Sequence, residues 1–482
     1  MPPARPAPTV PAGTGSGAYA KRAARTADRI IEDVINLGWP VGTVLGSEVE
    51  LLGRYDVSRA VFREAVRLLE HREVARTRRG PGGGLVVTEP SVAAVIDSVV
   101  LYLHRLDARL DEVFEARIVV EEIACDLAAR RLEEEDIIRL RRYLDEEHPP
   151  DAAEDPRALH RFLAACSRNA AIELFVDVLN RVALMYSPDW RLYGKEVETA
   201  HAHARIAAAV LEGDATTARR RMRIHLQAEG DYLRRKKSTR QILPGSVIGQ
   251  YPASGKLGES VARGIARSIV TGEMRAGDYV GSEADLMEQN GVSRAVFREA
   301  VRLLEYHHIA RMRRGPRGGL FVMAPSPEAV TDMAAIYLAR RGMPLAKLSE
   351  LRTAIEVSIV GLAAARAGAP GRAGIEEAIE REASAGDDDP EDPGAPGQVA
   401  FDLHTAVARA AGNRVLELVA SVLIRLSQLH RIDRMAPAQA DRVRAEILGS
   451  HIAIAAAVSD GDAELARHRM QRHLDVLGSY LS

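Results

Sequence analysis

The chain has 482 residues and a formal net charge of −2, and 46% of its residues are hydrophobic while only 4% are aromatic. This length excludes a single ordinary hydrophobic core, so we expect two to four domains. The composition favours helical domains over a large sheet, and the near-zero charge excludes a uniformly basic surface, so any face that binds nucleic acid must be local.

The N-terminal segment, residues 1–18, is rich in Pro, Ala and Gly and predicts a disordered leader, since it has neither the charged start nor the apolar stretch of a signal peptide. Apolar runs elsewhere, such as residues 452–458, are far shorter than the roughly 20 residues that cross a bilayer. Cys125 and Cys166 lie in apolar stretches without metal-type or redox spacing, which predicts buried thiols in a reducing cytosol. We therefore expect a cytoplasmic protein without a membrane partner.

An internal repeat dominates the sequence. Residues 57–70 read VSRAVFREAVRLLE, and residues 292–305 read the same. The match extends to GSEVELLGRYD and GSEADLMEQNG before these segments, and to RRGPGGGLVV and RRGPRGGLFV after them. Farther along, HARIAAAVLEGD parallels HIAIAAAVSDGD. Each half of the chain therefore contains the same unit.

The repeated segment predicts an amphipathic helix. At about 100° per residue, an apolar stripe and a basic stripe lie on opposite sides. The apolar stripe comprises Val57, Val61, Ala65 and Leu68, and the basic stripe comprises Arg59, Arg63 and Arg67. Ser58 is placed to cap this helix, and a short helix over residues 48–54 precedes it, which gives helix-turn-helix spacing.

A basic β-hairpin is expected after this helix. Arg76, Arg78 and Arg79 lead into the Gly-rich residues 80–84 and then into the β-forming residues 85–87. A helix of this size fits the major groove, where Arg donates two bonds to guanine, and a flexible basic tip reaches the backbone or the minor groove. The alternative is a solvated basic face followed by an ordinary loop. The second copy, with the same hairpin attached, argues against it.

This module resembles the winged helix-turn-helix of the GntR family, whose signature runs SE-x-E-L, then a VSR-x-x-V-REAL-like recognition helix, then a Gly-bearing wing. The resemblance implies double-stranded DNA as the partner. Fatty-acid-responsive relatives carry an Arg within SE-x-E-L, where this chain has Val49 and Ala284. The residues expected to contact DNA are Ser58, Arg59, Arg63, Arg67, Arg79, Gly82, Ser293, Arg294, Arg298, Arg302, Arg314 and Arg317.

The remainder of each half reads as several amphipathic helices and resembles the all-helical effector domain of the FadR-like GntR subfamily, called FCD. In that domain three histidines and an acidic residue bind a divalent metal, Zn or similar, which holds a carboxylate effector. The matching histidines are His160, His203, His225, His404, His451 and His473. The acid position, one turn before the first histidine, holds Pro156 and Ala400, while Asp155 and Asp402 face elsewhere on a regular helix. The alternative is that the histidines are polar core groups with local hydrogen bonds.

The resemblance also implies an arginine that grips the effector carboxylate, at Arg117 and Arg352. The alternative is an ordinary helical pair of Arg117 with Glu121, and of Arg352 with Glu356, which contributes only a few tenths of a kcal/mol where it is exposed.

The sequence thus predicts a mostly α protein with two winged helix-turn-helix domains, each with a small β-hairpin wing, and two all-α helical-bundle effector domains. The expected order is the leader at 1–18, a winged module at 19–90, an effector domain at 91–235, a linker at 236–256, a second winged module at 257–325 and a second effector domain at 326–482.

The function that follows is that of a bacterial transcription regulator, a repressor by the resemblance, which reads a near-palindromic operator and responds to a small carboxylate. We expect an intramolecular pseudo-dimer, alone or as a homodimer of two chains. The alternative is an architectural DNA-binding protein with ligand-free effector domains. An enzyme is disfavoured because we find no general base, nucleophile motif or phosphate loop in the sequence.

Overall fold

The structure is a computed structural model in which the chain divides into two compact units, residues 1–90 and residues 91–482, and each unit is described by itself. Most of the described residues are helical, and the strands form two small three-stranded sheets, which confirms the predicted fold class. The described residues are 15–80, 82–90, 92–145, 157–186, 197–235, 257–306, 308–313, 315, 318–384, 402–429 and 437–481. The expected linker at 236–256 lies outside them.

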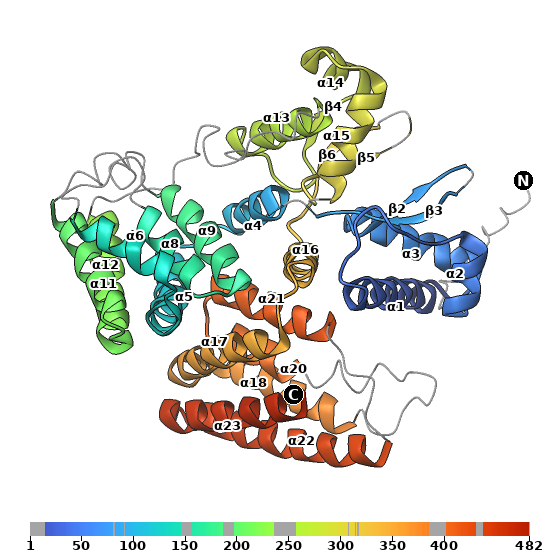
Figure 1. Ribbon diagram of the computed structural model, residues 1–482. Helices are drawn as coiled ribbons and strands as arrows, with labels where there is room; N and C mark the ends of the chain where they lie inside the picture. Colours follow the sequence, from blue (N-terminus) through green and yellow to red (C-terminus); the bar gives the residue numbers. More distant parts are fainter. Residues whose placement is uncertain are drawn as a thin grey trace, which may run out of the picture. The chain divides into compact units, whose positions relative to one another are not determined.

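The first unit is the first winged module (Figure 1). Its elements are α1 (Gly15–Asn36), β1 (Val44–Gly46), α2 (Glu48–Tyr55), α3 (Arg59–His71), β2 (Ala75–Arg78) and β3 (Gly84–Val87). The sheet has the order β1-β3-β2, and both pairings are antiparallel. Because α1 begins at Gly15, the last four residues of the expected leader belong to a helix, and the leader was placed too far along the chain.

Capping defines the helix-turn-helix. Ser47 and Glu50 form a capping box at the start of α2, which ends on Asp56 in the left-handed conformation. The Ser58 hydroxyl accepts a hydrogen bond from the Val61 amide at 3.3 Å and starts α3, as predicted.

The buried face of α3 differs slightly from the predicted stripe. Val61 and Ala65 are buried as expected, together with Phe62 and Leu69, whereas Leu68 is only half-buried. The apolar face is therefore centred nearer Phe62 and Leu69, because the helix packs against both α1 and the wing strand β2.

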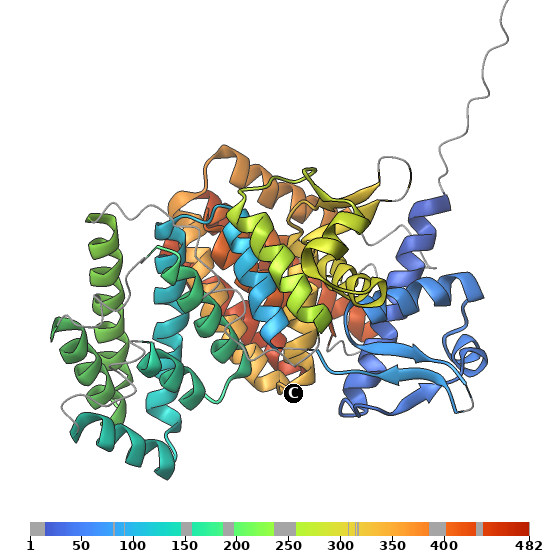
Figure 2. The same ribbon diagram turned by 90° about the horizontal axis from the view of Figure 1, so that it is seen from above.

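The wing depends on one close backbone approach. Gly84 begins β3 with a φ of +152°, and a Cβ atom at this position would lie 2.4 Å from the carbonyl oxygen of Gly46 on β1. Only glycine fits such a contact without displacing a strand. Figure 2 shows the β2–β3 hairpin that results.

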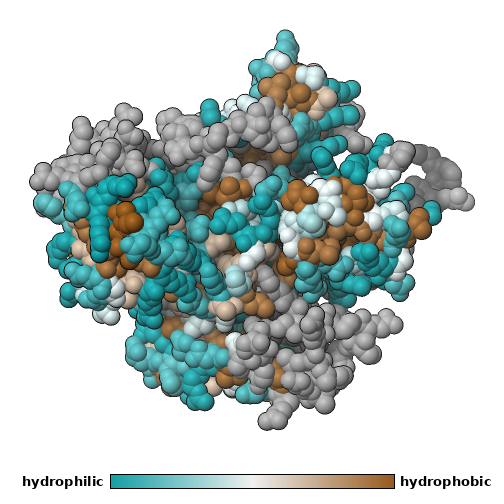
Figure 3. All heavy atoms as spheres, in the orientation of Figure 1, coloured by the Kyte–Doolittle hydropathy of each residue, from teal (hydrophilic) through white to brown (hydrophobic). Residues whose placement is uncertain are grey.

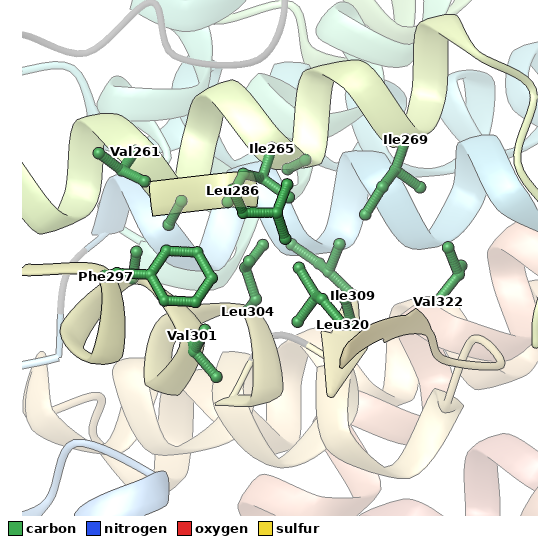
Figure 4. Packing of buried hydrophobic residues seen from close by; sticks show 14 of the residues in the cluster. Val261, Ile265, Ile269, Leu286, Phe297, Val301, Leu304, Ile309, Leu320 and Val322 are labelled. Atoms are coloured by element: carbon green, nitrogen blue, oxygen red, sulfur yellow. The ribbon is translucent and has the colours of Figure 1, made fainter. Parts of the chain in front are cut away.

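The second unit contains the second winged module, which repeats this architecture. Its elements are α13 (Leu257–Thr271), β4 (Tyr279–Gly281), α14 (Glu283–Asn290), α15 (Arg294–Tyr306), β5 (Ala310–Arg313) and β6 (Gly319–Val322), with the sheet order β4-β6-β5. Ile265, Phe297 and Leu320 meet in its core (Figure 4).

A leucine from outside this module completes the same core. Leu101, on the helix α4 (Val92–Arg105), is 4% exposed and belongs to the cluster. The Arg105 side chain at the end of α4 donates to the carbonyl oxygen of Met323, directly after β6. A helix that precedes the first effector bundle in the chain is thus docked on the second winged module.

The first effector domain is a bundle in which α5 packs against α9 and α12. Its remaining helices after α4 are α5 (Leu110–Arg131), α6 (Glu134–Asp145), α8 (Ala158–Cys166), α9 (Ala170–Leu184), α11 (Val197–Leu211) and α12 (Ala215–Arg235). Cys125 and Cys166 are buried in it as free thiols, as predicted. Hydrophilic side chains cover most of the outer face of α11 and α12 in Figure 3.

The second effector domain has the matching helices, with α17 packed against α23 in place of α5 against α12. They are α16 (Pro327–Arg340), α17 (Leu345–Arg366), α18 (Ala369–Ser384), α20 (Asp402–Ala410), α21 (Arg414–Leu429), α22 (Pro437–Ser459) and α23 (Ala463–Leu481). None of the described helices of either unit is long and apolar enough to cross a membrane.

Candidate nucleic-acid interface and metal centres

In the first winged module, α3 presents the predicted basic stripe outward. The side chains of Arg63 and Arg67 are 72% and 76% exposed, and Arg59 is exposed as well. Their ion pairs are exposed and local, with 3.8 Å between Arg63 and Glu48 and 2.9 Å between Arg67 and Glu64. Exposed pairs of this kind contribute about 0–1 kcal/mol, so exchanging them for phosphate or base contacts costs little. Ser58 serves as the helix cap described above.

A groove with a volume of about 390 Å³ runs between α2, α3 and the wing, and Arg63, Arg67 and Arg78 line it. Glu70, near the end of α3, accepts a hydrogen bond from the Thr77 amide on β2 at 2.9 Å and fixes the wing to the helix. Arg79 and Gly82 lie exposed at the wing.

The second winged module presents the same stripe on α15, where Arg294, Arg298 and Arg302 are exposed. Glu283 on α14 binds Arg294 at 2.8 Å and approaches Arg298 at 4.0 Å, and its hydrogen bond with Arg294 lowers the pKa of the Glu283 carboxyl. Ser293 lies at the start of α15, with its hydroxyl 3.5 Å from the Val296 amide. The expected contacts Arg314 and Arg317 lie outside the described residues.

In the first effector domain, three predicted histidines converge from three helices. His160 on α8, His203 on α11 and His225 on α12 are all buried. The Nε2 atom of His203 lies 3.2 Å from that of His160 and 3.1 Å from that of His225. Residues far apart in the chain thus point three ring nitrogens at one spot, within 4.8 Å of one another.

The second effector domain repeats the cluster with His404 on α20, His451 on α22 and His473 on α23, all buried. The Nε2 atom of His473 lies 3.1 Å from that of His451 and 3.3 Å from that of His404.

Carboxylates orient these rings from behind. Glu121 binds Nδ1 of His160, Glu356 binds Nδ1 of His404, and Glu382 binds Nδ1 of His451 at 2.6 Å. A carboxylate accepts a hydrogen bond from Nδ1–H, which keeps the proton on Nδ1 and leaves the Nε2 lone pair directed into the cluster. The sequence pattern pairs Glu121 and Glu356 with the arginines one turn earlier on the same helix, and it does not predict their contacts with the histidines.

The clusters suit a divalent metal. Burial lowers the pKa of His203 and His225 well below the usual value, and lowers that of His473 to about 2, so these rings are neutral and can act as ligands. Zn–N bonds of about 2.0–2.1 Å in a tetrahedral site set nitrogens about 3.3 Å apart. Two of the three Nε2 separations in each cluster, at 3.1–3.3 Å, fit that value.

The acidic ligand of the family has no counterpart among the described residues near these clusters. Pro156, Ala400 and Asp155 lie outside the described residues. Asp402 binds Arg381 at 3.1 Å and faces away from His404, as predicted.

Arg117 and Arg352 are buried, and each forms the helical pair with a glutamate one turn later that we considered as the alternative to an effector contact. Arg117 binds Glu121 at 2.8 Å and also Glu229 on α12 at 3.0 Å. Although burial opposes it, these carboxylates raise the pKa of Arg117. Arg352 binds Glu356 at 2.7 Å and the Ser427 hydroxyl at 3.3 Å. Each arginine therefore joins its histidine cluster through a shared glutamate.

The two arginine sites differ in one carboxylate. His225 and His473 are 248 residues apart, and the same offset places Leu477 where the first domain has Glu229. A carboxylate of the chain itself therefore occupies one edge of the Arg117 guanidinium, whereas the position matching Glu229 in the second domain is apolar.

A cavity of about 1020 Å³ also lies between α5, α12, α17 and α23. Its charged lining is paired within the protein: Glu122 binds Arg223, and Asp111 binds Arg234 at 2.8 Å. It therefore offers no converging set of groups for a ligand.

Two winged helix-turn-helix modules joined to helical domains with internal ligand-type clusters define a DNA-binding regulator controlled by small molecules. The comparison with known families agrees. The profile of the FCD domain matches residues 112–228 and 347–476, and that of the bacterial regulatory proteins of the gntR family matches residues 257–322. The chain belongs to the GntR family of transcription regulators, with the FCD domain present twice.

Known relatives are of the same kind and are not enzymes. The chain is 27% identical over 219 residues to the uncharacterized HTH-type transcriptional regulator YcbG of Bacillus subtilis, a match that covers 45% of this chain and 87% of the relative. It is 28% identical over 228 residues to the Uxu operon transcriptional regulator of Escherichia coli, covering 44% of this chain and 87% of the relative. Each relative thus corresponds to less than half of this chain.

Among solved structures, the GntR protein of Streptococcus agalactiae is 24% identical, with a TM-score of 0.31 over 44% of this chain and 99% of that chain. At this TM-score the likeness adds nothing to the family matches.

Proposed function

We propose that the chain is a repressor that reads a near-palindromic operator with both of its winged modules. The observation that carries this proposal is the identical basic stripe on α3 and α15, supplied twice by one polypeptide. Two-fold operators are ordinarily read by two copies of one module, and a covalent pair supplies both at a high effective concentration. Asymmetry in the operator would come from the wings, because Gly82 of the first wing corresponds in the repeat to Arg317 of the second wing.

The test is selection of bound sequences from random DNA with the wild-type chain and with the Arg59→Ala, Arg294→Ala double variant. We expect a short inverted repeat for the wild type and its loss in the variant. Arg142→Ala, an exposed arginine of α6, is the control and should select the wild-type sequence. An enriched site that survives the double substitution would mean that α3 and α15 are not the recognition helices.

The effector side of the proposal is a divalent metal in each histidine cluster, which a small carboxylate joins. When bound, the metal supplies positive charge and coordination positions for a carboxylate oxygen. The residues that would hold it are the three histidines of each cluster, oriented by Glu121, Glu356 and Glu382. Arg117 and Arg352 would attract the carboxylate, since a glutamate links each of them directly to a histidine of its cluster.

Metal content per chain tests this assignment. We expect about two equivalents of zinc or a similar ion in the wild type, and the loss of one equivalent in each of the variants His225→Ala and His473→Ala. His468→Ala is the matched control, since His468 lies on the same helix as His473 and is exposed. Equal metal content in all of these variants would refute the assignment.

A ligand-free first effector domain is a second candidate, favoured by the Glu229 carboxylate on Arg117. It corresponds to a protein in which at least one effector domain serves assembly alone. In titrations of the metal-loaded chain with citrate, a carboxylate probe, this arrangement predicts one binding event per chain, lost in Arg352→Ala and kept in Arg117→Ala. Two events per chain would exclude it.

A further inference from the structure

The two effector domains contact each other through a reciprocal pair of ion pairs. Arg131, at the end of α5, binds Glu350 on α17 at 2.6 Å, and Arg366, at the end of α17, binds Glu115 on α5 at 2.5 Å. Arg131 and Arg366 are separated by 235 residues, as are Glu115 and Glu350, which is the offset of the internal repeat. At these positions each domain plays the same part toward the other, as in an isologous dimer.

Two asparagines extend this symmetry. Asn169 caps α9 and donates through Nδ2 to the carbonyl oxygen of Lys347 at 3.2 Å. Asn413 caps α21 and donates through Nδ2 to the carbonyl oxygen of Glu112 at 3.0 Å. The two helix starts thus rest on equivalent points of the opposite domain.

The side chains at these points break the symmetry. Glu112 of the first domain corresponds to Lys347 of the second, with opposite charge. Glu112 receives the guanidinium of Arg414, with 2.8 Å from Nε to Oε1 and 2.5 Å from Nη2 to Oε2. The position that matches Arg414 in the first domain is Ala170. Lys347 instead donates to the carbonyl oxygen of Arg168 at 2.6 Å.

The charges allow only one of the three ways in which these domains could pair. Two second domains would set Lys347 against Arg414, two cations. Two first domains would leave Glu112 without the Arg414 guanidinium and would direct its carboxylate at the Arg168 carbonyl, an acceptor against an acceptor. We propose that this interface is coded for unlike pairing, so that each effector domain takes the other domain of its own chain as partner and rejects the same domain of a second chain.

Burial makes this code effective. The Glu112 side chain is 3% exposed, so without Arg414 this buried carboxylate would keep a single cation, Arg109, whose Nε lies 3.3 Å away and whose side chain is 69% exposed. Like charges that face each other are a strong device for excluding a wrong partner, whereas the reciprocal pairs at Arg131 and Arg366 would form in every pairing and cannot discriminate.

The experiment measures the mass of the full chain by light scattering after gel filtration, without DNA, metal or effector, so it does not depend on the proposed function. The wild-type chain, of 52.4 kDa, should be monomeric. In Arg414→Glu the unlike pairing sets two acids together, while a pairing of two second domains now sets Lys347 against the introduced carboxylate. We expect this variant to double its mass or, where the interface opens without re-pairing, to lose several degrees in Tm.

The compensating variant carries Glu112→Lys and Arg414→Glu together and should recover a monomer and part of the lost Tm, which separates a charge code from general damage to folding. Arg381→Glu, an exposed site paired with Asp402 elsewhere in the second domain, is the control and should stay monomeric. A wild-type mass and Tm in Arg414→Glu would overturn the proposal. So would a double variant that is no better than the single one.

Discussion

Truncating Leu101 should loosen a module to which this residue does not belong in sequence. Leu101 is 4% exposed and lies on α4, yet it packs in the core of the second winged module. A Leu→Ala change at a buried site costs about 2–5 kcal/mol, depending on how far the cavity collapses. We expect the lower part of this range, about 2 kcal/mol, because the side chain lies between two packed elements that can move together.

Hydrogen exchange followed by mass spectrometry localises this loss. A cost of about 2 kcal/mol raises the open population roughly 30-fold. The strands β5 and β6 should therefore exchange that much faster in Leu101→Ala, although they lie more than 200 residues farther along the chain. Ile138→Ala, on α6 with the side chain 48% exposed, is the control and should change exchange little. Equal exchange of β5 and β6 in the two variants would refute the docking of α4.

Three further predictions concern the wing, the domain interface and the metal. Gly84→Ala should abolish operator binding, because its Cβ would meet the Gly46 carbonyl, whereas Gly53→Ala, with open space around it, should bind normally in an anisotropy titration. Arg414 holds the pKa of Glu112 at about 2 against the opposing effect of burial, so the stability that this carboxylate contributes is complete above about pH 4.5 and is lost as the pH falls toward 2. Unfolding in urea should show a steeper fall over that window in the wild type than in Glu112→Gln. A chelator such as EDTA should lower the Tm of the purified chain by several degrees, and an unchanged Tm after verified metal removal would contradict a ligand-stabilised core.

The parts of the fold that were predictable from sequence are those fixed by local pattern. The cap at Ser58, the basic stripe and the Gly-bearing wing all follow from residues within a few positions of one another. The apolar stripe was centred slightly wrongly, on Leu68 in place of Leu69, because helical periodicity does not say which neighbours the face must fit.

The histidine clusters were predictable from the family resemblance, since the repeat preserves the spacing of His203 to His225 and of His451 to His473. The carboxylates behind the rings were not, because Glu121 meets His160 across 39 residues and no periodic pattern encodes that contact. The packing of Leu101 in the second winged module and the pairing of Glu112 with Arg414 could not be predicted from the sequence for the same reason. Both depend on how domains from the two halves pack, which local pattern does not describe.

The position of α4 also limits how the chain can be divided. A polypeptide that begins at Lys256 would contain every helix and strand of the second winged module, yet it would lack Leu101 and the Arg105 contact to Met323. The second winged module of such a polypeptide would expose the apolar surface that α4 covers. The two halves are therefore not equivalent, although their sequences are similar. A functional half-length regulator would need another element in place of α4 to cover this surface.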